Sequence, residues 1–199
     1  VAARDLGRPG AMAEFADFLR RESLYVFTIN GFPYGPFHGT RVKEDVYRPD
    51  WRDEARLEYT NLLADLLAQW VPAGVDSGGS ISTVPGAFRS AAGTAADAER
   101  IAGQLVRHAA HLVHLERRTG RRIVLALEPE PCCLLETIAE TVAFFREHLH
   151  SAAAAEQDVA QHQPCRARRF GSRVDLLDPE VRGGPGVEFE LDAIDVGEI

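Results

Sequence analysis

Two glutamates, Glu128 and Glu130, directly follow an apolar run and alternate with two prolines. The run, from Arg122 to Leu127, predicts a buried strand, so Glu128 is expected where that strand ends. A carboxylate fixed between a strand and a proline is an oxygen donor with little freedom, which suits a hard divalent cation. Glu128 is therefore the candidate catalytic residue and metal ligand. Two other readings stay open, because Glu128 could instead cap a helix or pair with a nearby arginine such as Arg121.

Polar residues also occur where two other predicted strands end. The continuous apolar run Leu24–Ile29, which predicts a buried parallel strand, is followed by Asn30. The run Ser80–Val84 carries Ser82 and Thr83 near its end. In a parallel α/β barrel the strand-to-helix loops form one rim, and function collects there. Asn30, Thr83 and Glu130 are accordingly candidate substrate-binding residues, although Glu130, one step past a proline, could simply face water.

The segment from Asn30 to Trp51 shows neither helical nor strand periodicity, and loops of this length in compact domains are usually functional or disordered. Its aromatic residues and prolines favour an ordered loop. Aromatic side chains on a barrel rim are typical of a pocket that covers a small ligand. They could equally pack down as a lid on the core. The candidate substrate-binding residues of this loop are Phe32, Tyr34 and His38, and its other aromatic residues are Phe37 and Tyr47.

Three histidines and two adjacent cysteines offer other chemistry. His108, His111 and His114 recur at three-residue spacing on a predicted helix, which a barrel would place outside, so surface or interface histidines are favoured over a metal site. Cys132 and Cys133 cannot easily face one ion, and no second cysteine pair completes a zinc site. The chain has neither a nucleophile elbow nor a Walker-type phosphate loop.

Helical periodicity predicts the elements that position these residues. Apolar stripes indicate helices over residues 11–22, 53–71, 94–119 and 137–150, and Thr137 with Glu140 forms a capping box. Helices alternating with strands predict a parallel sheet with right-handed crossovers. Because no strand is followed by a glycine-rich dinucleotide fingerprint, a barrel is favoured over a doubly wound sheet.

The predicted fold class is therefore α/β, of the (β/α)8 TIM barrel type. A complete barrel needs eight strands in about 250 residues, and only three or four are expected here, so the barrel is incomplete. Residues 1–150 are expected to form the partial barrel domain. Residues 151–199 are an atypical tail, rich in arginine and then in glycine, proline and acids, for which disorder is one reading.

Composition narrows the classes of partner. The chain has a formal net charge of −8, with the acids concentrated in its last stretch, which argues against a nucleic-acid surface. No apolar run approaches the length that spans a bilayer, and no signal peptide opens the chain. Three cysteines, two of them adjacent, fit a reducing compartment and predict a cytoplasmic location.

Three segments together resemble the EboE family of metabolite traffic proteins: Tyr25–Gly39, Gly79–Phe88 and Leu125–Thr137. That family is similar to the xylose isomerase-like, or sugar phosphate isomerase/epimerase, barrels. The resemblance covers about residues 10–150. It implies a TIM barrel, a divalent metal (Mn, Mg or Zn), a small-molecule metabolite as ligand, and partner proteins encoded in the same gene cluster.

In the wider superfamily the first metal ligand is a strand-end glutamate, a role that the resemblance carries to Glu128. The next ligands are expected from an Asp-x-x-His strand end before Val187–Glu190, but Arg182–Gly186 lacks that motif. Residues 152–186 do not resemble the family, while their flanks do. A disrupted reading frame is one explanation, and a misjudged short motif is the other. The ligand set of this chain is therefore incomplete.

Three functions follow from these expectations. The first is metal-assisted proton transfer next to a carbonyl, which isomerises or epimerises a sugar phosphate. The second is a non-catalytic protein that binds or scaffolds a metabolite in the barrel pocket. The third, phosphodiester cleavage at abasic DNA sites, needs a basic surface that the charge of the chain does not favour.

Overall fold

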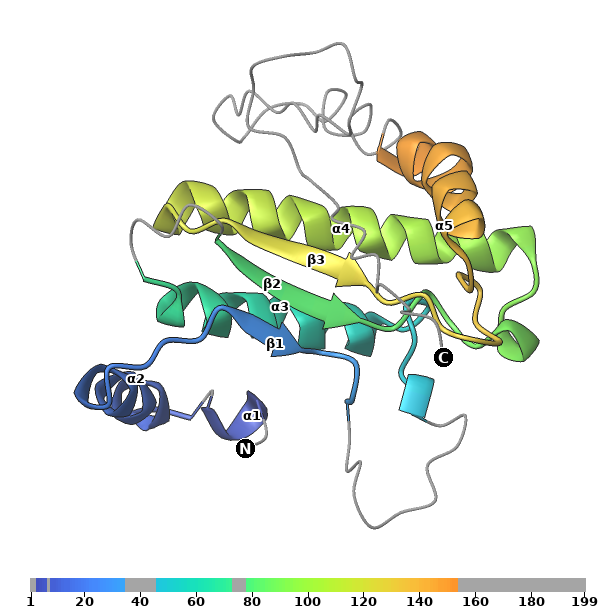
Figure 1. The fold of residues 1–199 in the computed structure, drawn as a ribbon. Coiled ribbons are helices and arrows are strands. Elements are labelled where there is room, and N and C mark those ends of the chain that lie inside the picture. The colour runs from blue at the N-terminus through green and yellow to red at the C-terminus, as the bar shows by residue number, and fades with distance from the viewer. Residues whose placement is uncertain (1–2, 7, 35–45, 73–77, 154–199) are drawn as a thin grey trace, which may run out of the picture.

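The computed structural model of the chain describes residues 3–6, 8–34, 46–72 and 78–153. These residues form a mixed α/β structure in which helices and strands alternate along the chain (Figure 1). The elements that matter here are α1 (Ala3–Leu6), α2 (Ala11–Arg21), β1 (Thr28–Asn30), α3 (Glu54–Trp70), β2 (Gly79–Thr83), α4 (Ala95–Thr119), β3 (Ile123–Leu127) and α5 (Ile138–Phe144), which continues as a π-helical turn, η3 (Phe145–Leu149).

The three strands form one sheet in the order β1-β2-β3, and both pairings are parallel. Thr28 pairs with Ser80, which pairs with Val124, and Asn30 pairs with Ser82. The predicted adjacency and direction of the strands are thus confirmed. The carboxyl ends of all three strands meet at one edge, on the right of Figure 1. Within the described part of the chain the sheet is open and has three strands, and a closed barrel is not seen.

Side-chain alternation divides the sheet into two faces. Ile29, Ile81 and Leu125 point toward α3 and α4, where they pack in a core with leucines of both helices. None of the described helices lies across the opposite face in Figure 1. That face carries Thr28, Asn30, Ser80, Ser82, Val124 and Ala126.

The first strand is shorter than predicted, and the expectation of a buried strand over residues 24–29 was wrong. Regular pairing begins only at Thr28, because the partner strand starts at Gly79. Leu24, Tyr25 and Phe27 precede the ladder and are 56–57% exposed. Since β1 is an edge strand, its apolar run is not enclosed as an interior parallel strand would be.

Helix termini explain why the later elements begin and end where the sequence predicted. Thr137 and Glu140 form the expected capping box at the start of α5. Gly120 ends α4 in the left-handed conformation, with φ of 67°. An additional capping box, Thr94 with Asp97, begins α4. These caps fix the loops that enter and leave β3. The predicted tail, residues 151–199, lies almost wholly outside the described residues.

Candidate site at the carboxyl ends of the strands

Glu128 lies one residue beyond β3 and extends the ladder, because its backbone N–H donates to the carbonyl oxygen of Thr83 at 3.1 Å. The two-residue period of the strand places it on the same face as Ala126 and Val124. Within the described residues, no group donates a hydrogen bond to its half-buried carboxylate. The carboxylate is thus held at the strand ends, where no described residue uses its oxygens as acceptors.

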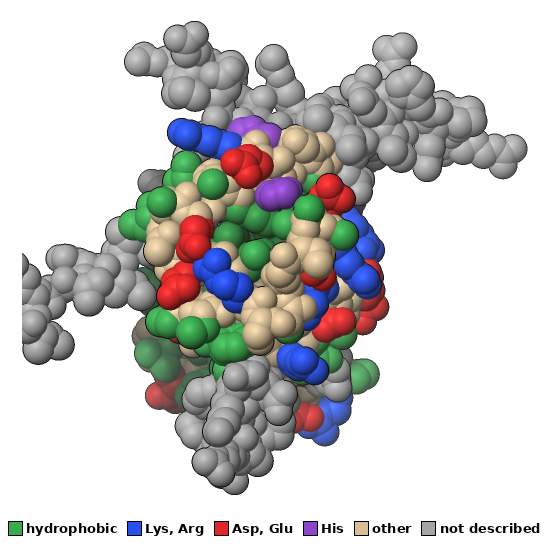
Figure 2. All heavy atoms as spheres, turned by 90° about the vertical axis from the view of Figure 1, so that its right-hand side faces the viewer, with side chains coloured by type: hydrophobic (Ala, Val, Ile, Leu, Met, Phe, Trp, Pro, Cys, Tyr) green, Lys and Arg blue, Asp and Glu red, His purple; other side chains and the backbone are tan. Residues whose placement is uncertain are grey.

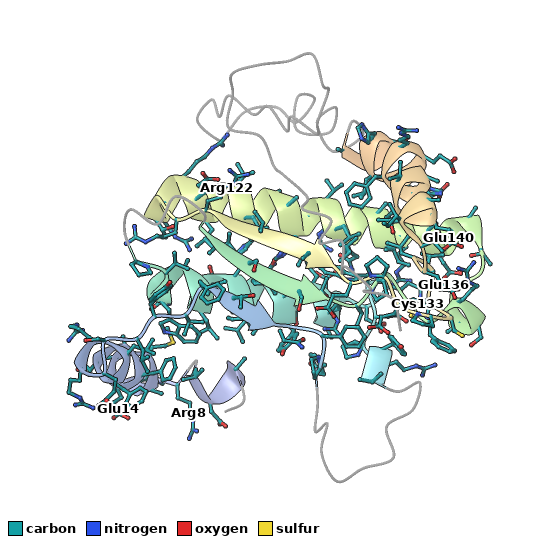
Figure 3. All side chains as sticks on the ribbon, in the orientation of Figure 1. Arg8, Glu14, Arg122, Cys133, Glu136 and Glu140 are labelled. Carbon is teal, nitrogen blue, oxygen red and sulfur yellow. The ribbon has the colours of Figure 1, made fainter. Side chains whose placement is uncertain are left out.

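Among the described residues, neither structural alternative for Glu128 is found. Arg121 lies at the opposite end of β3, where its Nε donates to the carbonyl oxygen of Val71 at 2.9 Å. The helix that follows Glu128 is capped by Thr137 instead. Figure 3 shows the separation of the two ends: Arg122 lies where β3 starts, and Cys133, Glu136 and Glu140 lie where the chain has left it.

The predicted strand-end residues divide between the two faces of the sheet. Asn30 and Ser82 lie on the face of Glu128, and their strands are neighbours. Thr83 is fully buried on the opposite face, and its hydroxyl has no hydrogen-bond partner. Thr83 therefore contributes a backbone carbonyl to the edge, whereas Ser82 contributes the side chain.

Asn30 is conformationally fixed by its own turn. Its Oδ1 accepts a hydrogen bond from the backbone N–H of Phe32 at 3.0 Å, which is an Asx turn. Within the described part of the chain, its amide nitrogen has no acceptor. The side chain can therefore donate to a ligand from a fixed position.

Farther down the same face, hydroxyl groups continue the polar row. The Ser80 hydroxyl donates to Thr28 Oγ1 at 2.9 Å, across the β1–β2 pair. With Asn30 and Ser82, these residues make the β1–β2 half of the face polar, whereas the β3 half carries Val124 and Ala126. The arrangement offers several donors and acceptors beside one carboxylate, which suits a ligand rich in oxygen.

An aromatic cluster stands beside this edge. The rings of Phe32 and Tyr47 meet edge to face with centroids 5.4 Å apart, and Tyr47 lies 5.3 Å from Phe88. Burial raises the pKa of Tyr47 to about 12, and the nearby Cys133 and Glu130 add to that increase. The predicted aromatic wall therefore exists in part. Phe37 and His38 lie outside the described residues, and the wall's role in binding stays a prediction.

Arg56, which the sequence analysis did not single out, holds both ends of the aromatic loop. Its fully buried guanidinium donates to the carbonyl oxygens of Pro49 at 2.7 Å, Gly31 at 2.9 Å and Phe32 at 3.2 Å. Burial lowers its pKa to about 10, so it stays charged at neutral pH. A single arginine at the start of an otherwise leucine-rich helical stripe was the signal available in the sequence.

Tyr34 and Tyr59 pack around the same guanidinium. Their ring centroids lie 5.9 and 5.7 Å from its central carbon, and the two rings meet edge to face at 5.0 Å. The Tyr59 hydroxyl donates to the carbonyl oxygen of Pro33 at 2.9 Å. Tyr34 is thus part of the support of the loop on α3.

Glu130 and the two cysteines form the turn after Glu128. The Glu130 N–H donates to the Leu135 carbonyl, and the Glu130 carbonyl accepts from the Cys133 N–H, both at 3.2 Å. Cys132 is exposed with a left-handed φ of 64°, and Cys133 is buried, with its pKa raised to about 11 mainly by burial. The two thiols thus occupy different environments.

Of the three α4 histidines, His114 is exposed as expected, whereas His108 and His111 differ from the expectation of surface or interface positions. His108 is fully buried, and its Nδ1 lies 2.6 Å from Asn61 Oδ1 on α3. His111 Nε2 lies 3.3 Å from an Asp65 carboxylate oxygen. They pack between the two helices because α4 covers α3 as well as the sheet. Among the described residues, no group of three or more histidines, cysteines and acids could hold a metal ion.

Charge at the strand-end edge is mixed. Figure 2 views the molecule from the side toward which the strands of Figure 1 point, and acidic, basic and hydrophobic side chains are interspersed on that face. Arg89 pairs with Glu140 at 2.8 Å and with Glu136 at 3.4 Å, and Figure 3 shows these two glutamates beyond the end of β3. No helix in the described ranges is long and apolar enough to cross a membrane.

Comparison with protein-family models, with curated proteins and with solved structures finds no match for this chain. Its function must therefore be inferred from the geometry of the strand-end edge.

Proposed function

We propose that the strand-end edge is the site of a sugar phosphate isomerase/epimerase-like protein of the EboE type, and that Glu128 moves a proton next to a substrate carbonyl. One observation carries this proposal: Glu128 is fixed at the end of a parallel strand, and no described residue donates a hydrogen bond to its carboxylate. In parallel α/β folds, residues in this position contact the ligand.

The dimensions of the polar face suit a small sugar derivative. Neighbouring strands lie about 4.8 Å apart, so Asn30 on β1 and Glu128 beyond β3 are separated by roughly 10 Å across the sheet. Ser82 lies between them on β2. Hydroxyl and amide groups at this spacing can bind the oxygens of a five- or six-carbon chain while the carboxylate faces one carbon.

The proton transfer needs few groups. The Glu128 carboxylate would take a proton from the carbon next to the carbonyl, and the electron pair would form an enediolate. The carboxylic acid would then return the proton to the neighbouring carbon from the same side, while the hydroxyl proton of the first carbon passes to the former carbonyl oxygen, which turns an aldose into a ketose. Epimerisation would instead need a second acid on the opposite side of the enediolate. The donors on the polar face would stabilise the negative charge that develops on the oxygens.

A divalent metal is implied by the family resemblance, but the described residues do not fit one by themselves. They provide a single candidate carboxylate, and no group of three ligands. Hard cations are held by several oxygens or nitrogens at fixed positions. No step above therefore passes through a metal. For the same reason we propose that the three parallel strands belong to a larger (β/α)8 barrel.

The second candidate function is non-catalytic binding of a metabolite at the same edge. It is favoured by the same sparse set of acids, because binding a polyhydroxylated ligand needs donors and acceptors but no acid–base partner. Cleavage of abasic DNA is less well supported, since the net charge is −8 and the strand-end face mixes both signs of charge.

Solvent deuterium distinguishes the first two functions. The chain is incubated in D₂O with a panel of aldose and ketose phosphates, and proton NMR follows exchange at the carbon next to the carbonyl. Catalysis predicts exchange that Glu128→Gln abolishes and that Glu147→Gln, an exposed control on η3, retains. Ligand binding seen by saturation-transfer NMR without exchange would support the binding protein. Exchange that survives Glu128→Gln would refute the role of Glu128.

A further inference from the structure

An apolar cavity lies on the other side of the sheet from Glu128. It has a volume of about 300 Å³, is open on one side, and is bordered by α1, α2, β1 and the flank of α3. Its walls on α3 follow one stripe, Tyr59, Leu63, Leu66 and Trp70. Tyr59 and Trp70 are eleven positions apart on the helix, so the stripe is about 16 Å long.

The lining is hydrophobic and uncharged. Leu6, Phe15, Val26 and Ile29 complete the walls, and none of the residues described around the cavity is an Asp, Glu, Lys, Arg or His. The charged side chains that the structure describes nearby point elsewhere. Arg8 pairs with Asp5, both more than half exposed, and Figure 3 shows Arg8 and Glu14 on the outer sides of their segments. A charged ligand would therefore lose its hydration without gaining a partner.

Two polar residues line the end of the cavity that is nearer the strand ends. Asn30 has an amide nitrogen without an acceptor among the described residues, and the Tyr59 oxygen, which donates to Pro33, can still accept. One donor and one acceptor at one end of an apolar cavity match a hydroxyl group. The volume is about ten times that of a water molecule in the liquid.

We propose that this cavity binds an uncharged amphiphile, an alcohol with a medium-length alkyl chain of about ten non-hydrogen atoms. Its hydroxyl group bonds with Asn30 and Tyr59, and its chain lies along α3 toward Trp70. The cavity and Glu128 are on opposite faces of the sheet. Asn30 ends the edge strand β1 and borders both sites, whereas Tyr59 and Trp70 line the cavity alone, so quenching of Trp70 reports on the cavity separately from the function proposed for the strand-end edge.

Fluorescence tests the proposal directly, because Trp70 lines the cavity and the second tryptophan, Trp51, is fully buried elsewhere against His108. Bromine quenches a tryptophan that it touches, so 8-bromooctan-1-ol is the probe. In Trp51→Phe, where only Trp70 emits, we expect saturable quenching that octan-1-ol reverses. In Trp70→Phe, we expect little quenching of Trp51.

Two further comparisons test the shape and the charge of the site. Val26→Phe fills the cavity and should weaken binding at least fivefold, while Val142→Phe on α5, another half-buried valine, should not. The anion 8-bromooctanoate should bind at least tenfold more weakly than the alcohol. Circular dichroism confirms that each variant is folded.

Several results would overturn the proposal. These are quenching that does not saturate, equal quenching of both tryptophans, failure of octan-1-ol to compete, or tighter binding of the carboxylate than of the alcohol. If Val26→Phe does not fold, the comparison between the two tryptophans and the competition experiment still decide the question.

Discussion

Acid should destabilise this protein through His108. The imidazole is fully buried between α3 and α4, and burial, with a smaller effect of His111, lowers its pKa from 6.5 to about 3. Its Nδ1 faces Asn61 Oδ1, so the neutral ring donates to the amide oxygen. Its Nε2 has no hydrogen-bond partner in the structure. The folded state therefore holds the neutral form.

The sign of the pH dependence follows from linkage. Between pH 6.5 and 3 the unfolded chain binds a proton at this position and the folded chain does not, so stability is lost as the pH falls. The loss is about 2 kcal/mol at pH 5 and approaches about 5 kcal/mol near pH 3, from 1.36 kcal/mol per pKa unit. Above pH 7 the contribution of His108 is nearly constant.

Urea denaturation at pH 7.5 and pH 5, followed by far-UV circular dichroism, measures this loss. His108→Gln keeps a polar side chain of similar reach without the titration, so its stability should fall by about 2 kcal/mol less between the two pH values. His148→Gln on η3 is the control and should behave as the parent protein. If the parent and His108→Gln lose the same stability, the proton is not taken up at His108 and the reasoning is wrong.

Two other substitutions test the support of the strand-end edge. Arg56→Met leaves three carbonyl oxygens without their donor and should lower the free energy of unfolding by about 3 kcal/mol in urea. The exposed control Arg118→Met should stay within about 0.5 kcal/mol, and equal effects would contradict the role of Arg56. Gly31→Ala places a Cβ 2.8 Å from both Leu63 Cδ1 and the Ser82 carbonyl oxygen. We therefore expect the free energy of unfolding to fall by about 1–3 kcal/mol, and an unchanged Tm would contradict this packing.

Local signals in the sequence predicted much of the fold. The apolar run before Glu128 became β3, and the Thr137–Glu140 pair became the N-terminus of α5, because each signal depends on neighbouring residues alone. Parallel pairing followed from the alternation of helices and strands. These features therefore needed no knowledge of distant contacts.

Features that depend on distant contacts could not be predicted in the same way. Leu24 and Phe27 have the composition of a buried strand, but their exposure is decided by where β2 begins. Arg56 and His108 are polar residues whose burial depends on backbone carbonyls or an amide brought from other elements. From composition alone, such residues are expected at the surface.

The candidate site was predicted in outline. Strand-end geometry was enough to predict that Asn30 and Glu128 lie at one edge, because parallel strands end on the same side of a sheet. The choice of Ser82 over Thr83 as the side chain on that face depends on strand register, which a one-residue shift reverses. Sequence patterns therefore predict the edge of the sheet at which a residue lies more reliably than the face toward which its side chain points.

The most direct test of the central claim, that Glu128 is the functional carboxylate of the edge, is a titration with Mn²⁺ followed by paramagnetic broadening of backbone amide signals. One carboxylate with water as its other ligands should bind the ion weakly. We predict that Mn²⁺ binds weakly and broadens amide signals around Glu128 and the neighbouring ends of β1 and β2. This broadening should be absent in Glu128→Gln. Tight binding, or broadening at this edge that persists in Glu128→Gln, would contradict the account.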